Sequence, residues 1–291
     1  MNLGIEADFY RWKPAAALRI SGEDSPSFLQ GQFTNDLHKQ GIGGAVYGLW
    51  LNQKGKVLAD SFVLKIAAQE FWVVSYFSPA AVIRERLEAY VIADDVVIED
   101  LTEEMAGLTV FGQAAPADWV PAGGQSFLGR RTQGLQAEII FPVSAEAAMG
   151  AKLAGATLLA PLEVERRRIA AEIPAVPADI GSADLPNEGG LETDAISYTK
   201  GCYLGQEVMA RLKSMGKVRR QLVRVRGEGT LPGLPALLFQ GGRKAGELRS
   251  AAPEGAGWIG LALVSLLQVQ RADGLSLAAQ GAPTIAFFET S

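Results

Sequence analysis

The chain has little of the chemistry that most metal and redox sites need. Among its 291 residues there is one cysteine, Cys202, and one histidine, His38. A single thiol forms no disulfide within the chain and builds no cysteine-rich metal site. A single histidine argues against a His-based metal site and against a Ser-His-Asp triad. We therefore predict no resident metal ion, and we interpret His38 as structural because a lone imidazole without a partner is not poised for catalysis.

Two further absences limit the partners. The net charge is −5, from 27 basic and 32 acidic residues, so no broad basic field favours duplex nucleic acid. The first residues, Met1 to Asp8, lack the basic and apolar regions of a secretory signal. The most apolar stretch, 258–269, is too short to span a bilayer. We expect a cytoplasmic protein that binds neither membrane nor duplex nucleic acid.

At 30.9 kDa the chain is long enough for two cores. Up to about residue 220, strand-like and helix-like segments alternate, which is typical of an α+β protein. After that point short alternating strands are separated by turns, which predicts a small all-β barrel or sandwich. We predict two domains, 1–220 and 221–291.

Within the first domain, apolar patterns and turn residues predict the individual elements. Helices are expected to begin at Ser25 and Ser78 and to cover 162–171. Strands are expected at 18–20, 45–51, 56–66, 71–76, 96–98, 108–111 and 138–141. Residues 173–190 show little periodicity, and an irregular segment of this length inside a compact chain is usually functional.

The surroundings of Cys202 bear on its reactivity. Residues 196–199 alternate like a strand, and residues 206–212 are rich in helix formers. This pattern predicts that Cys202 lies on a strand-to-helix turn, near a helix N-terminus and two residues from the Lys200 ammonium group. Both features favour the thiolate. The alternative is a buried and inert thiol, since free cysteine is among the most buried residue types.

The basic side chains indicate a binding site less strongly than the surroundings of Cys202 do. The run Arg166-Arg167-Arg168 lies on a predicted helix and is more typical of a solvated face than of an anion site. A cluster of Lys200, Arg211 and Arg168 would hold a carboxylate-rich ligand if the fold brings the three together.

The segment Lys200-Gly201-Cys202-Tyr203-Leu204-Gly205-Gln206-Glu207 resembles the signature of the YgfZ/Iba57 family of folate-binding proteins, relatives of the glycine-cleavage aminomethyltransferase. Further segments resemble the same family: 28–36 its N-terminal segment, 52–57 its hairpin, and 165–174 and 185–188 the run-up to the cysteine. The matches extend from about residue 18 to residue 264.

This resemblance implies a fold and a role. The fold is α+β, with two interwoven ferredoxin-like-type subdomains around a tetrahydrofolate cavity and a C-terminal antiparallel β-barrel. The implied role is the assembly or repair of iron–sulfur clusters in client proteins. The implied ligands are tetrahydrofolate and a transient iron–sulfur cluster, and the implied partners are folate and iron–sulfur client proteins.

The resemblance also assigns residues. Cys202 would act as a thiolate, with Lys200 lowering its pKa and meeting the folate glutamate tail. Asn35 and Asp60 would line the cavity, and Gln206 and Arg211 are further candidate folate ligands.

The chain departs from the aminomethyltransferase pattern at two places. Of two adjacent acids after the hairpin only Asp60 is present, because Ala59 replaces the first. Ala170 stands where the pterin-facing glutamate is expected, and we hypothesise that Glu172 substitutes for it, since a carboxylate is the natural acceptor for two pterin N–H groups.

Three functions follow as alternatives. The first is a folate-dependent accessory protein for iron–sulfur cluster assembly or repair, which uses the Cys202 thiolate. The second is a tetrahydrofolate-dependent aminomethyl- or methyltransferase, in which Asp60 stabilises charge that develops at N5 or N10. The third is a non-catalytic binding module in which Cys202 is merely packed. The residues leave open whether the chain catalyses a reaction.

Overall fold

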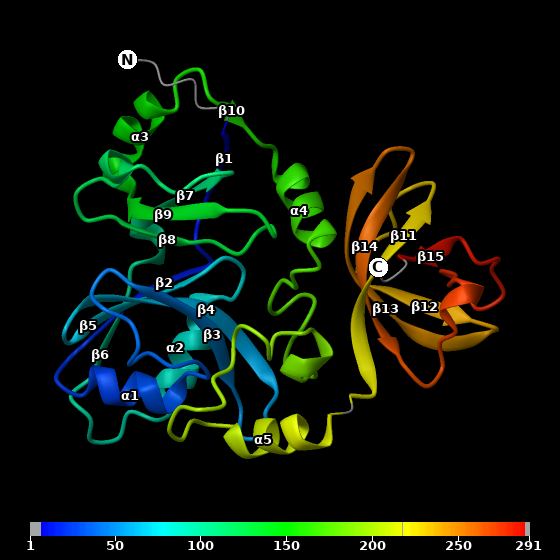
Figure 1. The fold of residues 1–291 in the computed structure, drawn as a ribbon, viewed down its shortest axis with the longest axis horizontal. Helices are drawn as coiled ribbons and strands as arrows, with labels where there is room; N and C mark the ends of the chain where they lie inside the picture. Colours follow the sequence, from blue (N-terminus) through cyan, green and yellow to red (C-terminus); the bar gives the residue numbers. More distant parts are fainter. Residues whose placement is uncertain (1–6, 217, 289–291) are drawn as a thin grey trace.

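The computed structural model describes residues 7–216 and 218–288. Two β-sheets lie one above the other, and a third sheet forms a separate body beside them (Figure 1). Helix α4 and the segments that follow it connect the two parts (Figure 1). None of the helices in the described ranges is long and apolar enough to cross a membrane.

The first sheet has the strand order β10-β1-β7-β9-β8. Its strands are β1 (Asp8–Trp12), β7 (Met105–Phe111), β8 (Gln125–Leu128), β9 (Gln136–Pro142) and β10 (Thr157–Leu158). Helix α3 (Glu146–Lys152) follows β9. Gly107 on β7 allows close packing, because a Cβ there would lie 2.2 Å from the Trp12 indole ring on β1. Their Cα positions pair directly across the two antiparallel strands.

The second sheet has the order β3-β4-β5-β2-β6. Its strands are β2 (Ala16–Ser21), β3 (Ala45–Leu51), β4 (Val57–Ala67), β5 (Glu70–Ser75) and β6 (Val97–Asp100). Helices α1 (Ser25–Gln32) and α2 (Ala80–Glu88) pack against this sheet over a core that includes Phe33, Trp50, Ile83 and Leu87. The proline at the start of α1 fits there because the first helical N–H groups have no helical partner.

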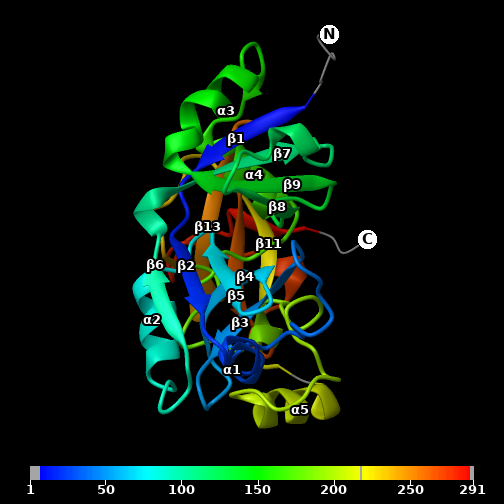
Figure 2. The same cartoon turned by 90° about the vertical axis from the view of Figure 1, so that its left-hand side faces the viewer.

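The two sheets exchange chain segments, as predicted for interwoven subdomains. The chain starts in the first sheet with β1, builds the whole second sheet with β2 to β6, and returns to the first sheet with β7 to β10 (Figure 2). A shared apolar cluster lies between the sheets and contains Trp12 and Phe127 from the first sheet and Phe62 and Val74 from the second. The pocket described below borders this cluster.

The C-terminal sheet has the order β12-β13-β14-β11-β15. Its strands are β11 (Arg220–Glu228), β12 (Ala236–Gln240), β13 (Arg243–Glu254), β14 (Gly257–Ser265) and β15 (Ile285–Phe287). Two isolated bridges join its edges, because Ser276 pairs with Phe239 of β12 and Leu275 pairs with Ile285 of β15. These bridges close the curled sheet, so the prediction of a C-terminal antiparallel β-barrel is confirmed.

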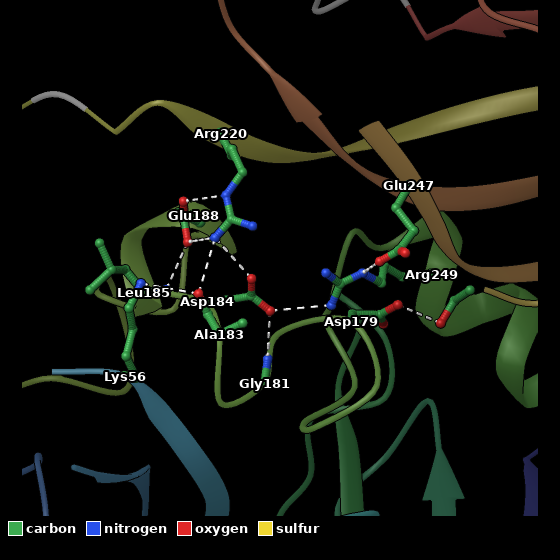
Figure 3. A network of polar contacts seen from close by, with 11 residues as sticks. Lys56, Asp179, Gly181, Ala183, Asp184, Leu185, Glu188, Arg220, Glu247 and Arg249 are labelled. Atoms are coloured by element: carbon green, nitrogen blue, oxygen red, sulfur yellow. Dashed lines mark hydrogen bonds and ion pairs between the residues drawn. The ribbon is translucent and has the colours of Figure 1, made fainter. Parts of the chain in front are cut away.

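Helix α4 (Pro161–Ala170), an irregular segment over 171–205 and helix α5 (Gln206–Met215) join the sheets to the barrel. The irregular segment contains a single 3-10 turn, Pro186–Glu188. Three of its acidic side chains, Asp179, Asp184 and Glu188, are almost completely buried. Figure 3 shows that they point toward polar side chains of the barrel. The irregular segment is therefore a fixed part of the interface with the barrel.

Candidate functional site

A small pocket opens beside the apolar cluster between the two sheets. Its cavity volume is about 10 Å³, room for about one water molecule and far below the ~300–1,000 Å³ of typical ligand sites. It is lined by Tyr47 on β3, Asp60 on β4, Tyr76 and Phe77 after β5, Arg130 and Arg131 after β8, Arg168 on α4, and Ile173 and Pro174. Larger hollows on the barrel are lined by barrel residues alone.

Asp60 is the pocket's buried acid, with 6% of its surface exposed. Its carboxylate accepts hydrogen bonds from Tyr47 Oη at 2.9 Å, Ser75 Oγ at 3.0 Å and Ser78 Oγ at 2.7 Å. Burial raises the pKa of the Asp60 carboxyl, and the three hydroxyl donors oppose this increase. Asp60 is thus buried at the pocket and not exposed at a strand end, and its role toward folate stays a prediction.

Glu138 on β9 forms a second buried acidic centre next to the pocket. Its carboxylate is fully buried and accepts hydrogen bonds from Arg131 Nε at 3.2 Å, Tyr76 Oη at 2.7 Å and Thr109 Oγ1 at 2.7 Å. The Arg131 guanidinium lies 3.8 Å from the centroid of the Tyr76 ring. Sequence reasoning missed this centre, although a glutamate in the middle of an apolar strand indicates a buried charge that needs a partner.

Cys202 lies outside this pocket. It is exposed, in an irregular turn just before α5, so the burial expected in the inert-thiol alternative is not found. The helix after it is confirmed, but residues 196–199 form no strand. Within that stretch the backbone N–H of Ser197 donates to the carbonyl of Thr34, which places it against the end of α1 rather than in a sheet.

Lys200 is buried, with 8% of its surface exposed. Its ammonium group donates to the carbonyl oxygens of Gln30 at 2.7 Å, Phe33 at 2.6 Å and Asn35 at 2.9 Å. These carbonyls lie at the C-terminal end of α1, where backbone acceptors lack helical partners and a cation is favoured. The hydrogen bonds of Lys200 therefore anchor the Cys202 segment to α1, and its role beside the thiol and the folate glutamate tail stays a prediction.

The Lys200 anchor predicts a pH dependence of stability. Burial lowers the pKa of Lys200 to about 8, whereas an unfolded lysine titrates near ~10.4. Between these values the unfolded chain binds the extra proton, so the stability contribution of Lys200 rises with pH. We expect the unfolding free energy of the wild type, relative to Lys200→Met, to increase by about 1 kcal/mol from pH 7 to pH 9.

Urea unfolding of both proteins at several pH values measures this difference. The control is Lys213→Met, which removes one exposed lysine of α5. A difference that is flat or decreases between pH 7 and pH 9 would show that burial does not disfavour the ammonium form of Lys200.

Two glycines pack the Cys202 segment against the β3–β4 hairpin. Gly205 has φ +87°, and a Cβ there would lie 2.9 Å from the carbonyl oxygen of Asn52. Gly55 has φ +70°, and a Cβ there would lie 2.9 Å from the Val208 side chain. Both positions need the left-handed backbone and the missing side chain of glycine. The hairpin and the segment after Cys202, which are distant in sequence, therefore form one packed unit.

The remaining predicted residues lie around this unit. Asn35 is a connector, because its Nδ2 donates to the carbonyls of Tyr47 at 2.8 Å and Asp194 at 2.9 Å. Gln206 is the first residue of α5, and Arg211 is exposed further along that helix. Glu172 is exposed, and its Oε1 lies 3.5 Å from Arg224 Nε on the barrel. Of the residues considered in the sequence analysis, the pocket lining contains Asp60 and Arg168.

The three adjacent arginines have different surroundings. Arg166 and Arg167 pair with Glu163 on the partly exposed side of α4, as predicted for a solvated face. For Arg168 that prediction is wrong, because its guanidinium is 3% exposed and donates to Asp179 Oδ2 at 2.7 Å and to Ser250 Oγ on β13 at 2.8 Å. Its hydrogen bonds therefore connect α4 to the barrel, and it shares none of these partners with Lys200.

Comparison with known proteins gives separate matches for the first part of the chain and for the C-terminal barrel. Residues 12–117 match the family model of the GCVT N-terminal domain, and residues 219–287 match that of the CAF17 C-terminal beta-barrel domain. The mouse protein named iron-sulfur cluster assembly factor IBA57, mitochondrial, is 29% identical, over 90% of this chain and 78% of that protein. The tRNA-modifying protein YgfZ of Photobacterium profundum is 28% identical, over 73% of this chain and 68% of that protein.

The predicted resemblance to the YgfZ/Iba57 family is confirmed. The aminomethyltransferase T of the glycine cleavage system from Bartonella henselae has the same fold, with a TM-score of 0.80 over 97% of this chain and 85% of that chain. The two sequences are 16% identical, so this likeness establishes the fold alone. The sequence comparisons and the structural comparison therefore agree on an α+β fold with a C-terminal barrel.

Proposed function

We propose that this chain is a folate-binding accessory protein for the assembly or repair of iron–sulfur clusters, with Cys202 as its reactive group. The observation that carries the proposal is the connection between the exposed thiol and the pocket. Lys200 ties the Cys202 segment to Asn35, and Asn35 donates to the backbone of Tyr47, which lines the pocket. The names of the mouse and human relatives, 29% identical over most of this chain, support the iron–sulfur role.

The pocket offers the types of side chain that a folate needs. Tyr47, Tyr76 and Phe77 supply aromatic rings, and Asp60 is a buried acceptor for ring N–H groups. Arg130 supplies a guanidinium that suits a carboxylate. The cavity of about 10 Å³ has room for about one water molecule in this structure, so entry of a folate requires the lining side chains to move. When bound, a reduced folate would supply a one-carbon unit.

Cys202 suits a transient role with a cluster. It is exposed, and within the described residues no group of three or more His, Cys, Asp or Glu side chains is arranged to hold a metal ion. Iron–sulfur clusters are usually held by four protein ligands. A cluster bound through Cys202 would therefore take its other ligands from a client protein, as expected for a transfer step rather than for permanent storage.

The two alternatives have less support. For an aminomethyltransferase, two adjacent acids are expected after the hairpin, and Ala59 replaces the first of them, which leaves Asp60 alone. For a non-catalytic module with a packed thiol, Cys202 would have to be buried, and it is exposed.

The proposal predicts that folate protects Cys202. Addition of 5-formyltetrahydrofolate is expected to slow the alkylation of Cys202 by iodoacetamide severalfold, because an occupied pocket restricts the segments to which the Cys202 loop is tied. Cys202 is the only cysteine, so the mass of the intact protein reports this residue directly. The urea-unfolded protein provides the control rate. If the ligand does not bind, the folate part of the proposal is rejected; if it binds without protection, the pocket and the thiol are independent.

A further inference from the structure

The arginine side chains of the pocket differ in how firmly they are held. Within the described part of the chain, three arginines line the pocket. Two pair with carboxylates that are fully buried, namely Arg131 with Glu138 and Arg168 with Asp179. Arg130 instead pairs with Asp194, whose side chain is 49% exposed. A pair with one exposed partner is weaker, because water solvates that partner when it leaves, whereas separating a fully buried pair leaves an uncompensated charge. Among the pocket arginines, Arg130 is therefore the one whose carboxylate partner a ligand can replace.

Arg130 also covers the aromatic surface that the pocket offers. Its guanidinium carbon lies 4.5 Å from the centroid of the Tyr47 ring, and 16% of its side chain is exposed. Arg130 Nε donates to Asp194 Oδ2 at 2.8 Å, and Nη2 donates to Oδ1 at 3.4 Å. A planar ligand reaches the Tyr47 ring face only when this guanidinium moves, so the ion pair controls access.

We propose that the Arg130–Asp194 pair is a latch over the pocket, and that a carboxylate of the incoming ligand opens it by replacing Asp194 on Arg130. The two N–H groups that now hold Asp194 match the bidentate geometry of any carboxylate. The ligand class is a planar ring that carries a carboxylate, with the ring directed to the Tyr47 face and Asp60. This inference rests on the proposed folate-binding function and specifies how the ligand gains entry.

The backbone around Asp194 supports a side-chain latch rather than a moving loop. The carbonyl of Asp194 accepts a hydrogen bond from Asn35 Nδ2 at 2.9 Å, and the next carbonyl, that of Ala195, accepts one from Thr34 Oγ1 at 2.7 Å. These bonds do not involve the Asp194 carboxylate. The carboxylate is therefore free to leave Arg130 while the segment that leads to Lys200 stays in place.

The test compares Asp194→Asn with Glu88→Gln by isothermal titration calorimetry. Glu88 pairs with Arg84 on α2, its side chain is 48% exposed, and it does not line the pocket. Both changes remove one negative charge from the chain, so the change in net charge is the same in each. We expect Asp194→Asn to bind 5-formyltetrahydrofolate about fivefold more tightly than the wild type, which corresponds to the strength of an exposed ion pair. Glu88→Gln is expected to bind like the wild type.

A second variant tests the carboxylate directly. Arg130→Met removes the cover and the anion partner together. We expect it to bind 6-hydroxymethylpterin, which has the ring but no carboxylate, at least as tightly as the wild type does, and to lose most of the preference for 5-formyltetrahydrofolate over that ring. Equal folate affinity in the wild type and Asp194→Asn overturns the latch while folate binding stands. An unchanged preference in Arg130→Met overturns the assignment of the carboxylate to Arg130. If no variant binds either compound, both this inference and the folate proposal are rejected.

Discussion

Replacement of Asp184 by alanine is expected to lower the free energy of unfolding by about 3–5 kcal/mol, the usual loss when one partner of a buried ion pair is removed. Asp184 is 1% exposed and accepts hydrogen bonds from Arg220 at 2.9 Å, Arg249 at 3.2 Å and the backbone N–H of Gly181 at 3.0 Å. Figure 3 shows these groups converging on its carboxylate. The two arginines belong to different barrel strands, β11 and β13, so the loss would weaken the attachment of the barrel.

Urea unfolding monitored by tryptophan fluorescence measures this effect, and limited proteolysis within residues 173–190 measures the attachment of the barrel. The control is Glu254→Ala, which removes the partner of Arg166 in a pair whose glutamate is 44% exposed; a change within about 1 kcal/mol is expected there. A similarly small change for Asp184→Ala, without faster cleavage, would mean that the buried network of Figure 3 does not hold the barrel in place.

Replacement of Cys202 by serine is expected to reduce the activity of client iron–sulfur enzymes to the level of a strain that lacks the protein. Serine keeps the size of the side chain but is a poor iron ligand, since clusters are held by thiolates. Because Cys202 is exposed, the substitution removes no packing, and the melting temperature is expected to stay within about 2 °C of the wild-type value.

Complementation of a deletion strain measures this prediction, with the activity of a client enzyme normalised to the amount of its polypeptide. Ser214→Ala, which alters an exposed hydroxyl group on α5, is the matched control and is expected to restore full activity. Full restoration by Cys202→Ser would remove the thiol from the proposed function, and the pocket would then have to be considered without it.

Most elements of the fold were predictable from local patterns. Alternating apolar residues identified β2 to β7 and β9, and proline near the helix starts marked α1 and α2. Residues 196–199 were wrongly predicted as a strand for a physical reason. A strand needs a neighbouring strand to pair its backbone groups, and here the N–H of Ser197 bonds instead to the carbonyl of Thr34 at the end of α1.

The candidate site was less predictable than the fold. Asp60 was identified by resemblance, and it lines the pocket. Arg130, Tyr47 and Glu138 were missed, because no motif distinguishes them from ordinary surface or strand residues. Arg168 was expected in solvent because two further arginines precede it on one helix, but contact with Ser250 of the barrel buries it.

The sequence by itself determined most of the elements and their order, the resemblance to the YgfZ/Iba57 family and the isolation of Cys202 as the only thiol. Only the tertiary structure decided which charges meet. Lys200 is two residues from Cys202, yet its ammonium group donates to Gln30, 170 positions away along the chain. Local periodicity reports which side of an element is apolar, whereas the partners of a buried charge depend on how distant elements dock. That docking assigns Lys200 to the end of α1, Asp60 to the pocket, and Asp194 to the one pocket arginine whose partner is exposed.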